Sequence, residues 1–212
     1  PRVIAACASC CKTLREALPE VSVVSLWEVL DTECPSLSFR EEACCGGVPT
    51  LSIHDPCSAR HDEAWLRSVR SLLSKRGVPF EEPRLSGETT PCCGYGGLTW
   101  DANPQLASAI AADRAGQLEH DAVTSCIMCR ERLVAEGKPS LHMLDLLYPG
   151  ESLHAAATAK GSGLSARRAG RAALRTEVLR RYAGESVAET ADDGIPVRIA
   201  PDALEKMEER HI

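Results

Sequence analysis

Five cysteines in the middle of the chain follow one pattern of spacing. Cys57 is followed by 34 residues, then by the adjacent pair Cys92 and Cys93, then by 32 residues and the Cys-x-x-Cys loop of Cys126 and Cys129. Such a loop aims two thiolates at one point, and an adjacent pair can serve two neighbouring metal ions. Five thiolates exceed the four ligands of a tetrahedral zinc ion. The spacing therefore favours an iron–sulfur cluster, with zinc as the alternative.

The cysteine count also bears on the cellular setting. The chain has 212 residues with 11 cysteines, an odd number that suits a pure disulfide framework badly. A reducing cytoplasm with metal-ligating thiolates is the better interpretation. The net charge of −6 gives no reason to expect nucleic acid or anionic lipid as a partner. No apolar run approaches the roughly 20 residues of a membrane helix, so the sequence predicts no membrane span.

Short apolar runs alternate with segments of helical periodicity along the first 150 residues. Strands are expected over 3–6, 21–25, 51–54 and 122–125, and helices over 12–18, 26–30, 59–75, 103–118 and 127–135. This alternation predicts an α/β fold with a parallel twisted sheet flanked by helices. Sites in such sheets lie beyond the carboxyl ends of the strands. Cys7, Cys57 and Cys126 each follow a predicted strand, so the topology and the cysteine spacing agree.

The chain changes character after residue 150, where cysteine disappears. An arginine-rich helix is expected over 166–182, a strand over 195–199 and a helix over 202–210. We interpret 151–212 as a mainly helical C-terminal extension. The arginine-rich helix either docks an acidic redox partner or is a solvated face.

Three segments together resemble a known family. They are His54-Asp55-Pro56-Cys57, the glycine-rich loop Cys92-Cys93-Gly94-Tyr95-Gly96-Gly97, and Thr124-Ser125-Cys126-Ile127-Met128-Cys129. The pattern resembles the C-terminal half of the cysteine-rich CCG-domain proteins. These include the cysteine-rich subunit of heterodisulfide reductase, the iron–sulfur subunit of glycolate oxidase and lactate-utilisation proteins. The resemblance implies that the five cysteines bind a noncubane 4Fe-4S cluster.

The resemblance also implies a function. The expected work is redox: reduction of a small disulfide or thiol substrate, or relay of electrons among other redox subunits, flavin-containing or ferredoxin-like. The enzyme class expected is an oxidoreductase subunit. A zinc-stabilised scaffold that only organises a complex stays as the alternative.

The family usually carries its motif twice, which suggests a domain organisation. Residues 51–150 would be a complete half, and 1–50 the end of a first half. Cys7 and Cys10 look like the closing Cys-x-x-Cys of that first half and are candidates for a second site, with a second cluster or zinc. Its other ligands would lie before Pro1, in a longer chain or another subunit, or the site has decayed. Alternatively, Cys34, Cys44 and Cys45 complete it together with Cys7, Cys10 and Cys11, or are free loop thiols.

Two polar residues precede the first cysteine of the set. His54 is a candidate catalytic residue that would carry protons to a cluster-bound sulfur, because its ordinary pKa is near neutrality. The alternative is that it only fixes the turn. Asp55 is expected to cap the following helix.

Overall fold

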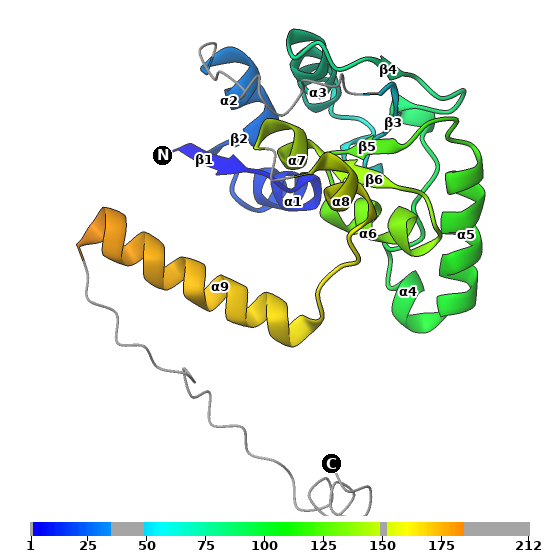
Figure 1. Cartoon of the computed structure of the whole chain (residues 1–212). Helices are drawn as coiled ribbons and strands as arrows, with labels where there is room; N and C mark the ends of the chain where they lie inside the picture. The colour runs from blue at the N-terminus through cyan, green and yellow to red at the C-terminus, as the bar shows by residue number, and fades with distance from the viewer. Residues whose placement is uncertain (1, 35–48, 149–151, 185–212) are drawn as a thin grey trace, which may run out of the picture. The chain divides into compact units, whose positions relative to one another are not determined.

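The computed structural model describes residues 2–34, 49–148 and 152–184. The chain divides into two compact units, Pro1–Gly161 and Ser162–Ile212, and each is described by itself. In the first unit strands alternate with helices, and all paired strands run parallel (Figure 1). This confirms the predicted α/β class with parallel sheets flanked by helices. The sequence pattern predicts one sheet, whereas the described residues form two.

The four-stranded sheet brings the segments that carry Cys57 and Cys126 together. The first sheet pairs β1 (Arg2–Ala5) with β2 (Ser22–Ser25). The second has the order β4-β3-β5-β6, made of β3 (Leu51–His54), β4 (Phe80–Glu81), β5 (Ala122–Thr124) and β6 (Ser140–His142). In its register His54 lies beside Thr124. The carboxyl ends of β3 and β5 therefore meet at one edge of the sheet.

Helices and short helical turns connect these strands. They are α1 (Ala8–Ala17), α2 (Leu26–Thr32), η2 (Cys57–Ala59), α3 (Glu63–Lys75), η3 (Gly87–Thr89), α4 (Thr99–Ala102), α5 (Pro104–Gly116), α6 (Ile127–Ala135), α7 (Met143–Leu147) and α8 (Leu153–Thr158). The bounds of β3 and α6 are those predicted. The helix predicted from residue 59 begins instead at Glu63, because the Asp62 side chain caps it by accepting from the Trp65 amide at 3.0 Å.

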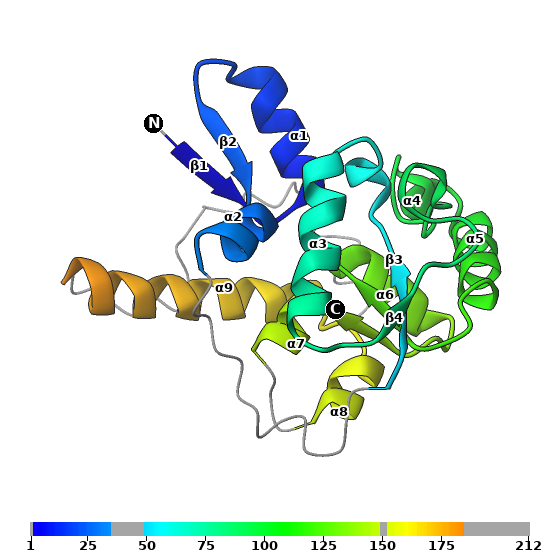
Figure 2. The ribbon, with the colours of Figure 1, turned by 90° about the horizontal axis from the view of Figure 1, so that it is seen from above.

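A tryptophan pair lies at the centre of the core. Trp27 of α2 and Trp65 of α3 are fully buried, with their rings edge to face and the centroids 6.2 Å apart. Figure 2 shows α3 between α2 and β3, and α2 packs on α3. The Trp65 indole donates to the Ser125 hydroxyl at 3.0 Å. Because Ser125 directly precedes Cys126, the core fixes the start of the Cys-x-x-Cys loop.

The first sheet and the end of the second repeat one supersecondary unit. The order β1-α1-β2-α2 matches β5-α6-β6-α7, with parallel strands in both. Cys7 and Cys126 occupy the same position, the extended residue just before the first helix of each unit. The second helix of each unit begins with a capping box, formed by Ser25 in one and His142 in the other. The similarity between the two Cys-x-x-Cys segments is thus structural as well as sequential.

The second unit begins with the arginine-rich helix α9 (Leu164–Val178), which continues as η4 (Leu179–Ala183). Most of its described side chains are exposed, including Leu174 and Tyr182. The strand expected over 195–199 and the helix over 202–210 lie outside the described residues. Among the described helices, none is both long and apolar enough to cross a membrane.

Trp65→Phe tests the link between the core and the Cys-x-x-Cys loop. The change leaves the buried Ser125 hydroxyl without its donor and removes ring volume, so we expect the free energy of unfolding to fall by about 2 kcal/mol. The measurement is urea unfolding followed by circular dichroism. The control is Trp100→Phe, whose ring is about one-third exposed beneath the Arg132 guanidinium; its loss should stay under about 1 kcal/mol. Equal losses of unfolding free energy in the two variants would contradict the proposed link between Trp65 and the Cys-x-x-Cys loop.

Candidate metal centre

The five cysteines come together at the edge where β3 and β5 end. Cys57 begins the turn η2, three residues after β3, and Cys126 immediately precedes α6, two residues after β5. Each thiol interacts with the next one, Cys57 with Cys92, Cys92 with Cys93, Cys93 with Cys129, and Cys129 with Cys126. Among these thiols and the neighbouring His54, the donor atoms that all lie within 4.8 Å of one another are those of Cys93, Cys129 and His54. Segments separated by more than 30 residues of sequence thus converge on one group of sulfur atoms.

The group has a buried side and an open side. Cys93 and Cys129 are 3% exposed, and Cys57 is exposed. Cys92 and Cys126 are intermediate. A metal held here would be shielded from water by the protein on one side and approachable from the Cys57 side.

Contacts among the five thiols lower the pKa of two of them and raise the pKa of the other three. Hydrogen bonds from Cys57 and Cys93, with two amides of the glycine-rich loop, hold the pKa of Cys92 far below its ordinary value. The Cys129 thiol and two helix amides lower the pKa of Cys126 to about 6. Hydrogen bonding to Cys92 raises the pKa of Cys57. Contact with the Cys129 thiol lowers the pKa of Cys93, but hydrogen bonding to Cys92 and burial outweigh it and raise that pKa to about 11. Hydrogen bonding to Cys126 and Cys93, with burial, raises the pKa of Cys129.

Gly94 explains why the cysteine pair is followed by glycine. Its φ is +82°, and a β-carbon there would lie 2.3 Å from the carbonyl oxygen of Ala107 in α5. Its amide donates to the Cys92 sulfur at 3.3 Å. A bare α-carbon therefore lets α5 pack directly on the cysteine loop while the backbone turns an amide toward a ligand atom.

Asp55 anchors the approach to the cysteine pair. Its buried carboxylate accepts from both terminal nitrogens of Arg70, at 3.0 and 2.9 Å, and from the Gly87 amide at 2.8 Å. The expectation that Asp55 caps the next helix is wrong, because Asp62 fills that position. Asp55 instead ties α3 to the segment that leads into Cys92.

His54 lies at the floor of the site. The ring is 1% exposed, and one ring nitrogen lies within 4.8 Å of the sulfur atoms of Cys93 and Cys129. Its Nδ1 accepts a hydrogen bond from Nε of Arg114 at 3.0 Å. Its Nε2 is buried without a hydrogen-bond partner among the described residues. Burial, with the neighbouring Arg114 charge, lowers the pKa of His54 to about 3.

Arg114 is the residue of this site that the sequence analysis did not single out. It is fully buried on α5. Together with Ala107 and Ala111 it occupies the buried face of that helix. That spacing of three and four residues is the signal that could have placed Arg114 in the interior.

The front cysteines form a separate pair. Cys7 and Cys10, at the start of α1, are exposed and hydrogen-bonded to each other. Cys11 is buried in the core, and Cys34 is partly buried. Cys44 and Cys45 lie outside the described residues, so their part in a second site stays a prediction. The nine described cysteines are all free thiols.

The donor set fits an iron–sulfur cluster better than a single zinc ion. Five sulfur atoms form one connected group, whereas a tetrahedral zinc site closes with four ligands. Backbone amides already point at the sulfurs of Cys92 and Cys126. Thiolate ligands surrounded by amide donors are the usual setting of iron–sulfur clusters.

Gly94→Ala tests the close packing of the glycine loop on α5. The methyl group would collide with a backbone carbonyl and force a side chain into the left-handed region, so we expect a loss of about 2 kcal/mol or more in unfolding free energy. Gly96→Ala is the matched control, because its β-carbon would meet nothing within 4 Å. Urea unfolding of the metal-free proteins compares them. Equal stability of the two variants would refute the packing argument.

Comparison with known proteins agrees with this geometry. Residues 51–133 match the family model of the CCG cysteine-rich domain. Neither a curated protein nor a solved structure matched the chain. The CCG domain is found in heterodisulfide reductase and in lactate-utilisation iron–sulfur proteins. The matched segment runs from β3 into α6 and contains all five clustered cysteines, and residues 51–133 are thus similar to the cysteine-rich domain of the CCG family.

Proposed function

We propose that the chain is an iron–sulfur redox subunit of the heterodisulfide reductase type. The observation that carries the proposal is the convergence of the five thiols of the CCG domain into one hydrogen-bonded group. The group would hold a noncubane 4Fe-4S cluster through Cys57, Cys92, Cys93, Cys126 and Cys129. When bound, such a cluster would supply single electrons for the reduction of a sulfur substrate.

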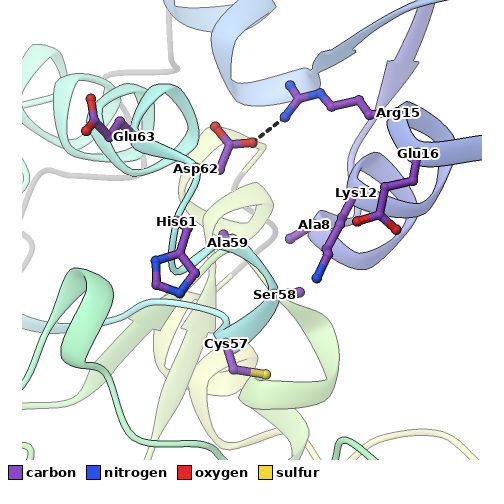
Figure 3. A pocket seen from close by; sticks show the side chains of 10 residues that line it. All are labelled: Ala8, Lys12, Arg15, Glu16, Cys57, Ser58, Ala59, His61, Asp62 and Glu63. Atoms are coloured by element: carbon purple, nitrogen blue, oxygen red, sulfur yellow. Dashed lines mark hydrogen bonds and ion pairs between the residues drawn. The ribbon is translucent and has the colours of Figure 1, made fainter. Parts of the chain in front are cut away.

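A pocket beside the site supports the proposal that the protein binds a substrate there. Its volume is about 590 Å³, and it lies between α1 and the segment from Cys57 to Glu63. Figure 3 shows Cys57 at one end and the Lys12 side chain extending from α1 toward Ser58. The one exposed cysteine of the five therefore borders a cavity large enough for a small organic molecule.

The chain's own residues have three tasks under this proposal. The cysteines bind the metal, and the buried side of the site, floored by Cys93 and Cys129, excludes water. The pocket next to Cys57 orients the substrate's sulfur atoms toward the open side. Electrons would come from another redox subunit, flavin-containing or ferredoxin-like, which α9 with its exposed arginines could dock. The free thiols suit a reducing compartment such as the cytoplasm.

Two alternatives have less support. A pure electron-transfer module needs no substrate cavity, and a pocket opens beside Cys57. A zinc scaffold leaves one of the five thiols without a metal. We also propose that 1–50 is the end of a first CCG half, which the repeated β-α-β-α unit supports. Cys7 and Cys10 would then belong to a second site, completed by residues from another segment or subunit.

Metal analysis of anaerobically purified protein tests the proposed function. We expect about four irons and as many acid-labile sulfides per chain for one cluster, and about eight if the front pair also holds one. Cys93→Ser should lose most of the iron, because its sulfur lies in the middle of the group. Cys7→Ser should keep about four irons in either case. Stoichiometric zinc without sulfide, or full iron retention in Cys93→Ser, would refute the ligand assignment.

The pocket is lined by charges of both signs, the cations Lys12 and Arg15 and the carboxylates Glu16, Asp62 and Glu63, so substrate preference is tested at Lys12 against Glu16. Lys12 has no ion-pair partner among the described residues, whereas the neighbouring Arg15 is held by Asp62 at 2.6 Å. Lys12→Met should raise KM about fivefold for the dianionic disulfide of thioglycolate and leave KM for the neutral disulfide of 2-mercaptoethanol unchanged. Reduced viologen is the electron donor in this assay. Glu16→Gln, in the same pocket, should shift the first KM in the opposite direction. An equal change of KM for both disulfides would contradict a role of Lys12 in binding an anionic substrate.

A further inference from the structure

We propose that His54 is a positioning residue that donates a fixed hydrogen bond from Nε2 to the sulfur atoms of the metal centre, and that Arg114 sets its tautomer. The acceptor would be a cluster sulfide or one of the thiolates of Cys93 and Cys129. The inference rests on the proposed function for the presence of a cluster. It assigns a role to two residues outside the five-cysteine set.

The tautomer follows from the contact between the two side chains. An arginine guanidinium can only donate hydrogen bonds. Because Nε of Arg114 donates to Nδ1 of His54 at 3.0 Å, Nδ1 carries no proton. A neutral imidazole has one proton, which must then be on Nε2.

The Nε2 proton needs an acceptor. A buried donor without a partner is costly, and among the described residues Nε2 has none. The sulfur atoms of Cys93 and Cys129 and one ring nitrogen of His54 all lie within 4.8 Å of one another. Thiolates and sulfides bound to iron are good acceptors. Loading the site therefore supplies the partner that Nε2 lacks.

The same contact argues against His54 as a metal ligand. A histidine that binds a metal usually donates from its other nitrogen to a carboxylate or carbonyl, which leaves the metal-binding nitrogen bare. Here the other nitrogen accepts from Arg114, so the proton lies on the nitrogen that would face the metal. His54 can thus complete the group as a donor and not as a sixth ligand. A ring held neutral also suits a fixed donor better than a proton carrier.

Arg114 adds charge as well as orientation. The fully buried guanidinium has neutral partners, the Leu85 carbonyl at 3.1 Å and the Gln117 side-chain oxygen at 3.2 Å, while its other terminal nitrogen has no partner among the described residues. The carboxylates of Asp55 and Asp113 lie near the guanidinium and favour its charged form, although neither forms a hydrogen bond to it. A thiolate-ligated cluster would add further negative charge beside this buried cation. The Nε2 donor and the guanidinium both stabilise the reduced, more negative centre, so both raise its reduction potential.

The metal-free protein gives the first test. With ¹⁵N-labelled histidine, long-range ¹H–¹⁵N correlation distinguishes the two neutral tautomers. We expect the His54 ring to carry its proton on Nε2 in the wild type, and Arg114→Met to mix the tautomers. His120→Gln serves as the control for resonance assignment, because that ring is partly exposed. A proton on Nδ1 in the wild type would overturn the proposal.

The iron-loaded protein gives the second test. Pulsed EPR of the reduced centre should show weak coupling to the His54 ¹⁵N and to one exchangeable deuteron in D₂O, and His54→Leu should abolish both. The reduction potential should shift to more negative values in His54→Leu and Arg114→Met, and less in His54→Gln, which keeps an N–H donor. Strong ¹⁵N coupling, typical of a ligand, would overturn the proposal. So would an unchanged potential in both His54→Leu and Arg114→Met.

The two proposals fail separately. Wild-type protein without iron and sulfide would refute the proposed function. The tautomer measurement on the metal-free protein would still test the role of His54, because a proton on Nδ1 would overturn it. If iron is present, the potential and the couplings judge His54 alone. Circular dichroism of each variant compares its fold with the wild type, and His54→Gln supplies the potential if His54→Leu does not fold.

Discussion

The parallel pairing of β3 with β5 is the constraint on which the candidate metal centre depends. The pair is held in one register by the buried side chains of Leu51, Ile53 and Val123, each at most 1% exposed. A shift of one residue would turn these side chains to the opposite face of the sheet. The apolar core therefore fixes where each strand ends. Since Cys57 and Cys126 follow those ends by three and two residues, the core also places the first and last cysteine segments side by side.

The glycine loop adds the third wall of the site. The contact of Gly94 with the Ala107 carbonyl sets how closely α5 approaches the cysteine pair. Arg114 lies seven residues after Ala107, two helical turns along the same buried face, where it reaches His54. Gly94 thus positions two groups. Its amide binds the Cys92 sulfur, and its missing side chain lets α5 approach closely enough to place the Arg114 guanidinium.

Strong local signals made part of this structure predictable. β3 was bounded by its apolar run and by Asp55-Pro56, and the convergence of the five thiols followed from cysteine spacing and from strand order. The division into two sheets did not follow, because alternation predicts parallel pairing without saying which strands pair. Arg114 was overlooked since a charged residue reads as surface, although its helical face is otherwise alanine. Its burial depends on His54, 60 residues away, which no local pattern reveals.

The two sides of the centre differ in a way that bears on its chemistry. The buried side gathers Cys93, Cys129, His54 and Arg114, which provide donors and a positive charge and no route for a substrate. The open side presents Cys57 to a pocket. A metal ion that only stabilised the fold would need neither a buried cation nor an approach from outside. The proposed redox function uses both: the cation behind the metal would stabilise the negative charge gained on reduction, and the cavity in front of it would hold the molecule that takes up the electrons.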